Sequence, residues 1–176
     1  WSKGLVGFKP APVFDVSQTD GEPLPELETA AMGDADDLVP ALKGAADELG
    51  VTVRIVDADD WDHGDAKGVC KYRSLHDLQP VVEAIARSNQ ADLAVTLIHE
   101  YAHALLHFDI GDEPERAKRE VEAEAVAYIV GRYFGLDTSG SAFYLAAWQG
   151  DDSEAIQERL GRISSTAQEI IGSLVE

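Results

Sequence analysis

The chain has 176 residues, which is long enough for one domain with a hydrophobic core of its own. Its 33 acidic residues against 14 Lys and Arg give a net charge of −19, which argues against direct nucleic-acid binding by this domain. No apolar run is long enough to span a membrane and no signal-peptide pattern is present, so we expect no membrane association. The single Cys70 allows no internal disulfide and fits a reducing, cytoplasmic setting.

The acidic residues are spread over the whole chain, while lysine is scarce. This composition is typical of high-salt cytoplasm, where dissolved ions screen the self-repulsion of a highly charged protein. We therefore predict a halophilic protein; the alternative is an ordinary acidic protein with a cationic partner. A halophilic chain should unfold at low salt and recover in molar KCl, as followed by circular dichroism. Stability that does not vary with KCl would contradict the prediction.

The N-terminal half predicts an irregular arm followed by a helix and a small sheet. Residues 1–30 are rich in proline, and the chain starts at Trp1 without Met, so we expect an extended arm continuing from an upstream domain. One folded domain is expected over 31–176. The elements expected at its start are an amphipathic helix over 36–49 ended by Gly50, a β-branched strand over 51–56, an edge strand over 68–75 and a short helix over 78–86.

The C-terminal half predicts helices. An almost entirely apolar run over 93–107 indicates a buried helix, with Ser88 or Asn89 as its N-terminal cap. Further helices are expected over 114–134 with a stop at Gly135, over 139–149, and over 153–174 with an apolar stripe of Ile156, Leu160, Ile163, Ile170 and Leu174. A few strands before a helical half indicate an α+β fold.

The buried helix carries the sequence His99-Glu100-Tyr101-Ala102-His103, an HExxH motif. Residues four apart lie on one face of a helix, so His99 and His103 can bind the same metal ion, most readily Zn²⁺. Glu100 can reach a water on that ion and act as a general base. The alternative is a pair of hydrogen-bonded core histidines, but burying three such groups unpaired would cost several kcal/mol.

A third protein ligand can come from two places. In one interpretation the third ligand is Asp109, in the next turn after the motif, as in metzincins. Those proteins have a glycine where this chain has Leu106, and leucine cannot easily make the left-handed turn that glycine makes. In the preferred reading the next helix runs antiparallel and brings Glu120 level with His103. The alternative for this helix is a solvated acidic face, a reading that suits Glu115 and Glu122 best.

Other groups are candidates for supporting roles. Glu124 lies one turn after Glu120, and we assign it to the orientation of a ligand histidine. The candidates for stabilising the oxyanion are Tyr128, Tyr133, His107 and His76. Of these, His107 fits either the cleft or the surface, and Tyr128 fits either the cleft or the core. Cys70 is expected to be a small core or edge residue rather than a nucleophile.

Residues 97–107 and 119–127 resemble the ImmA/IrrE-type metallopeptidases, and still more the metallopeptidase domain of ArdC-like antirestriction proteins. The second motif of the ImmA/IrrE type, Glu-x-x-Ala-Asn-x-Phe-Ala, falls here on Glu120, Ala123, Glu124, Val126 and Ala127. The resemblance therefore supports Glu120 as a metal ligand, while Glu124 stands where asparagine is usual. Residues 8–25, 137–141 and 144–148 also resemble the ArdC-like group, so the resemblance covers most of 8–150.

The resemblance implies a zincin-like fold, with a small sheet packed on a mainly helical half, and a gluzincin-like zinc metallopeptidase that cuts a protein partner. A transcriptional repressor or a restriction component are the partners it implies. One alternative is an ArdC-like antirestriction or regulatory module that binds its partner without proteolysis. Another is metal-dependent hydrolysis of a non-peptide substrate.

Overall fold

The structure is a computed structural model that describes residues 30–71, 79–107, 116–138 and 153–175. These residues form an α+β fold, as predicted. The elements in chain order are helix α1 (Leu38–Ala45), strand β1 (Thr52–Val56), the 3-10 helix η2 (Ala58–Asp60), strands β2 (Gly68–Lys71) and β3 (Val81–Ile85), and helices α2 (Gln90–His107), α3 (Arg116–Tyr133) and α4 (Ser153–Val175). The predicted arm over 1–30 falls, up to residue 29, outside the described residues.

The sheet has three strands in the order β1-β3-β2. Strand β3 pairs parallel with β1 and antiparallel with β2, so β2 is an edge strand, as expected. The helix predicted over 78–86 is wrong, because that segment contains the central strand β3. Its Val82 and Ala84 are completely buried and its backbone is paired on both sides, and this tertiary environment favours a strand for a short apolar run whose periodicity is ambiguous.

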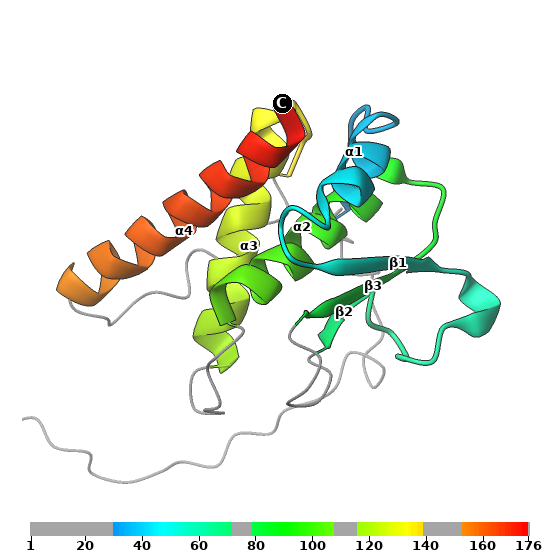
Figure 1. Cartoon of the computed structure of the whole chain (residues 1–176), viewed down its shortest axis with the longest axis horizontal. Coiled ribbons are helices and arrows are strands. Elements are labelled where there is room, and N and C mark those ends of the chain that lie inside the picture. The colour runs from blue at the N-terminus through cyan, green and yellow to red at the C-terminus, as the bar shows by residue number, and fades with distance from the viewer. Residues whose placement is uncertain (1–29, 72–78, 108–115, 139–152, 176) are drawn as a thin grey trace, which may run out of the picture.

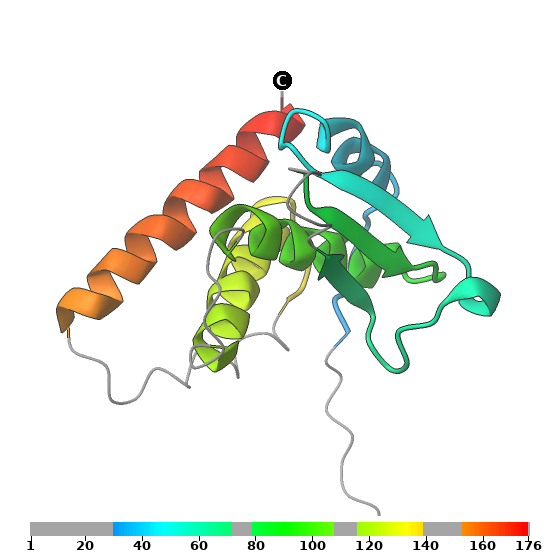
Figure 2. The ribbon, with the colours of Figure 1, turned by 60° about the horizontal axis from the view of Figure 1, so that its bottom comes forward.

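Helix α2 lies between the sheet and helix α3, and both views show this arrangement (Figures 1 and 2). Helix α4 packs against α3 and α2, and it also contacts α1. The most deeply buried large side chains include Tyr101, Leu97 and Ile98, all on α2. The helix is therefore the centre of the core, which is the position the apolar run predicts. The part of the chain that the structure describes contains no candidate for a membrane-spanning helix.

The other helix predictions that fall within the described residues agree with the structure to within a few residues. Helix α1 is shorter than the predicted 36–49 and passes through turns to Gly50, whose φ of 67° is in the left-handed region. Helix α3 ends at Tyr133, before Gly135, as expected. Of the stripe on α4, Ile163 and Ile170 are buried, but Leu160 is 50% exposed, so the prediction is wrong for that residue.

Several expected features lie outside the described residues. They are the strand residues after Lys71, the helix over 139–149, the side chain of Ile156, and the candidates Asp109 and His76.

Candidate metal centre

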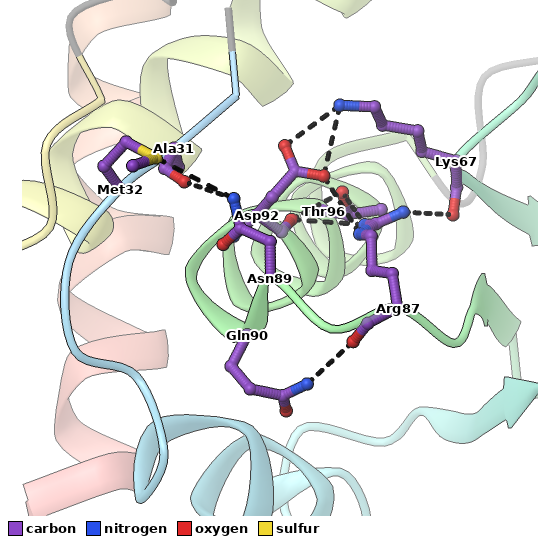
Figure 3. A network of polar contacts seen from close by, with 8 residues as sticks. All are labelled: Ala31, Met32, Lys67, Arg87, Asn89, Gln90, Asp92 and Thr96. Atoms are coloured by element: carbon purple, nitrogen blue, oxygen red, sulfur yellow. Dashed lines mark hydrogen bonds and ion pairs between the residues drawn. The ribbon is translucent and has the colours of Figure 1, made fainter.

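The N-terminal end of α2 is fixed by a polar network shown in Figure 3. The side-chain Oδ1 of Asn89 accepts a hydrogen bond from the backbone N–H of Asp92 at 3.0 Å, so Asn89 is the predicted cap. The carboxylate of Asp92 binds Lys67 Nζ at 3.0 Å and Arg87 Nε at 2.9 Å. Since Lys67 lies just before β2 and Arg87 just after β3, the network attaches the helix to two strands of the sheet.

Helix α3 packs along α2, and Gly131 lies near the far end of this contact. A Cβ added to Gly131 would lie at an ordinary contact distance of 3.5 Å from Val95 Cγ2 on α2, but only 2.8 Å from Thr138 Cγ2. Glycine is therefore needed there chiefly because the chain returns past it at Thr138. The packing of α3 against α2 brings Glu120, at the other end of α3, to the two histidines of the HExxH motif.

The side chains of His99, His103 and Glu120 converge on one point, as the sequence predicted. The two Nε2 atoms of the histidines lie 3.1 Å apart, and Glu120 Oε2 lies 3.6 Å from His99 Nε2 and 3.5 Å from His103 Nε2. Ligands at about 2.0–2.1 Å from a tetrahedral ion are separated by about 3.4 Å, so these three atoms fit the edges of one coordination polyhedron. The three residues could therefore hold a metal ion.

Glu100 lies beside this group and under the edge strand. It is 7% exposed, and burial raises the pKa of its carboxyl to about 7, against the lowering influence of His99 and of a backbone hydrogen bond from Cys70. Cys70 itself is a partly buried residue of β2, in agreement with the expected edge position. A carboxylate whose pKa is close to neutral can both accept and return a proton, which is the property required of a general base.

Strand β2 can lie this close to Glu100 because Gly68 has no side chain. A Cβ at this position would lie 2.6 Å from Thr96 Cγ2 and 2.9 Å from Glu100 Cγ. We expect Gly68→Ala to destabilise the fold by about 1–3 kcal/mol, because strand and helix must separate to admit the methyl group. Chemical denaturation would measure this.

The matched control is Gly44→Ala on α1, where a Cβ meets no atom within 4 Å. That substitution should stabilise the fold by about 0.5–1 kcal/mol, because alanine is the better helix former. Equal effects at the two positions would contradict the steric role assigned to Gly68.

Glu124 contacts the His99 ring at Nδ1, the nitrogen that does not face Glu120. Its Oε2 accepts a hydrogen bond from His99 Nδ1 at 3.0 Å, which leaves Nε2 of the same ring facing Glu120. A proton fixed on Nδ1 keeps the lone pair of Nε2 free for a metal. The predicted role of Glu124 therefore agrees with its position.

The sequence left the position of His107 open, between the cleft and the surface, and its prediction of a solvated Glu122 is wrong. His107 is 4% exposed, so it is not a surface histidine, and its Nδ1 lies 3.0 Å from His103 Nδ1. Glu122 is 1% exposed, so it does not belong to a solvated acidic face. Its carboxylate binds His107 Nε2 at 2.9 Å and Arg159 Nη1 at 3.0 Å.

The structure thus adds Arg159, on α4, to the groups that surround the site. The only sign of this arrangement in the local sequence is the third histidine, which follows His103 by four residues, as His103 follows His99.

The structure does not assign a role in the site to either tyrosine candidate. Tyr133 is 60% exposed and packs edge-on against Phe134, while Tyr128 is partly buried on α3, and its role in a cleft stays a prediction.

The protonation of His99 predicts how metal affinity depends on pH. Burial alone lowers the pKa of this imidazole, but bonds to Glu120 and Glu124 and the charge of Glu100 together raise it to about 9. At neutral pH the metal-free ring therefore carries a proton that must leave before Nε2 can bind a cation. We expect the affinity for zinc to rise about tenfold per pH unit from pH 7 and to level off near pH 9.

The measurement is zinc titration against a competing chelator at several pH values. Calorimetry in buffers of different ionisation enthalpy should detect close to one proton released from His99 per ion at neutral pH. An affinity that is constant between pH 7 and 9 would contradict the assignment.

Comparison with known proteins does not identify a family for this chain. No protein-family profile matches the chain, and no solved structure is detectably similar to it. Over 81 residues the chain is 37% identical to an uncharacterized protein of Bacillus anthracis. The match covers 44% of this chain and 14% of that protein, so the chain spans only a small part of its relative's length.

Proposed function

We propose that this chain is a zinc-dependent metallopeptidase domain of zincin-like fold, in which His99, His103 and Glu120 hold the ion. The observation that carries the proposal is the convergence of these three ligand atoms within 4.8 Å of one another, with the buried Glu100 beside them. A buried acid whose pKa is raised to about 7 next to a metal-ligand triad is a recognised property of hydrolytic sites. The resemblance to ImmA/IrrE-type and ArdC-like metallopeptidases supports the same reading.

In this proposal each residue has one task. A bound zinc ion would supply an acidified water and a positive charge for the carbonyl oxygen of the scissile peptide. Glu100 accepts the proton of the attacking water and returns it to the leaving amine. Glu124 keeps the His99 ring in the tautomer that presents Nε2 to the ion. Strand β2, an edge strand of the described part of the sheet and close to Glu100, would offer backbone groups to an extended substrate.

The substrate we propose is a protein partner, with a transcriptional repressor or a restriction component as the classes that the resemblance favours. We also propose that the domain acts in the cytoplasm, because a chain with one cysteine can form no internal disulfide and suits a reducing setting.

Metal content and chelator-sensitive hydrolysis test the proposal together. Native mass spectrometry of the chain purified with zinc should show one ion per chain. Cleavage of an unfolded protein such as casein, read by gel and mass spectrometry, should stop on chelation and return with added zinc. A chain that takes up no zinc, or that cleaves equally well after chelation, would overturn it.

A further inference from the structure

We propose that His107 and Glu122 form a hydrogen-bond relay that orients the ligand His103, and that Arg159 of helix α4 holds the far end of this relay. The inference rests on the metal centre proposed above. It assigns positioning roles to three residues from three different helices, none of which needs to contact the ion itself.

The relay is continuous in space. His103 Nδ1 lies 3.0 Å from His107 Nδ1, and His107 Nε2 lies 2.9 Å from Glu122 Oε2. The other oxygen of the same carboxylate, Oε1, accepts a hydrogen bond from Arg159 Nη1 at 3.0 Å, and Arg162 Nη1 lies 3.7 Å from it. The three contacts that link His103 to His107, Glu122 and Arg159 are therefore within ordinary hydrogen-bonding distance, whereas the longer Arg162 contact is an ion pair.

The order of donors and acceptors follows from the chemistry of the groups. If His103 gives the lone pair of Nε2 to a metal, its proton is on Nδ1, and this N–H can donate to His107 Nδ1, which lies 3.0 Å away. His107 Nδ1 must then be the bare nitrogen, so the proton of this ring is on Nε2, where it meets the Glu122 carboxylate. Glu122 thus selects the tautomer of His107 that can accept from His103.

Burial makes this arrangement selective. The side chains of His107 and Glu122 are 3% and 2% exposed, so water cannot replace a lost partner at low cost. A buried hydrogen-bonded pair alone would be weak evidence of function, because purely structural networks contain such pairs too. Here His107, which is bound to Glu122, contacts Nδ1 of the proposed ligand His103, just as Glu124 contacts Nδ1 of His99. Both imidazoles of the HExxH motif are therefore held at Nδ1, the nitrogen that does not face the proposed ion.

Helix α4 thereby supports the proposed metal centre without contacting the ion. Arg162 also donates from Nη2 to the carbonyl oxygen of Leu106 at 2.8 Å, which satisfies an acceptor in the last turn of α2. Docking of α4 therefore fixes both the end of the active helix and the relay behind His103.

The test compares two substitutions of His107 in the whole chain. His107→Leu removes the acceptor, and we expect zinc affinity to fall about 10–100-fold, the usual effect of losing a group that orients a ligand. His107→Asn places an amide oxygen near the position of Nδ1, and it should recover most of this loss. The control is Tyr101→Phe, which removes another buried hydrogen bond of α2, from Tyr101 to the carbonyl oxygen of Leu42, and should leave zinc affinity unchanged.

The readouts are zinc affinity by chelator competition and the visible absorption spectrum of the cobalt-substituted protein, each with circular dichroism as a check of folding. Only His107→Leu should change the cobalt spectrum. If folded His107→Leu bound zinc within twofold of wild type, the relay would be wrong while the metal centre stood. If wild type itself bound no zinc, the metal centre would be wrong, and the relay with it.

A second measurement covers the case in which His107→Leu fails to fold. Long-range proton–nitrogen correlation spectra of zinc-loaded wild type report which nitrogen of each imidazole carries the proton. We expect His107 as the Nε2–H tautomer and His103 with its proton on Nδ1. A proton on Nδ1 of His107 would overturn the relay without any substitution.

Discussion

Glu100→Gln should abolish peptide hydrolysis while leaving zinc bound. The amide cannot take a proton from water, and loss of a general base costs about 10²–10⁴-fold in rate. Glu100 is not one of the three converging ligands, so zinc affinity should stay within a few-fold of wild type. Glutamine is close in shape to glutamate, and its carbonyl oxygen can still accept the backbone hydrogen bond of Cys70.

The fold should tolerate this substitution. Because burial raises the pKa of Glu100 to about 7 in the metal-free protein, the acid form is favoured in the folded state, and the stability it contributes is lost as pH rises through that value. At pH 8 the metal-free Glu100→Gln chain should therefore be at least as stable as wild type in chemical denaturation. Hydrolysis is measured with a quenched fluorescent peptide library at saturating zinc.

The same variant separates the proposed peptidase from a module that acts by binding alone. If the biological effect of the protein on its partner is lost with Glu100→Gln, catalysis carries that effect. If the effect is retained while hydrolysis is lost, the domain acts by binding. Undiminished hydrolysis by the variant would contradict the role of Glu100 as general base.

Glu120→Ala should remove most of the affinity for zinc. If a binding free energy of about 10–16 kcal/mol is shared over three or four ligands, loss of one of them corresponds to about 3 kcal/mol or more, a fall of at least about 100-fold. Its two contacts, to His99 and His103, would both disappear. The fold should survive, because the side chain of Glu120 is 49% exposed.

The matched control is Glu169→Ala, which removes an exposed carboxylate from α4. It should leave zinc affinity unchanged and so exclude a general effect of charge in this acidic chain. Affinity is measured by chelator competition at one pH and one salt concentration, since both alter it. Full affinity in Glu120→Ala would show that the third ligand comes from elsewhere.

Features encoded by local pattern were predictable from the sequence. The HExxH spacing and the apolar surroundings of α2 predicted that His99, Glu100 and His103 share a buried helix, and the helical spacing of α3 predicted that Glu120 and Glu124 face it; the structure brings these side chains together. These predictions depend on residues three or four positions apart on one helix, together with a short connection between two helices.

Features that depend on distant contacts were not predictable. The run containing Val81 and Val82 fits a helix or a strand equally well, and its pairing with both β1 and β2 decides the outcome. Glu122 looked like a solvated acid because its partner Arg159 is 37 residues away along the chain. Its burial, and with it that of His107, follows from the docking of α4, a contact that no local pattern encodes.

The two ends of helix α2 are anchored to opposite parts of the protein. Asp92 attaches the first turn to Lys67 and Arg87 beside the sheet, and Arg162 attaches the last turn to α4. These contacts at both ends oppose sliding of the helix along its axis and rotation about it. In the metal centre that we propose, imidazoles held in place before a cation binds would make coordination cost little conformational entropy, and removal of the ion should leave a site that can be loaded again.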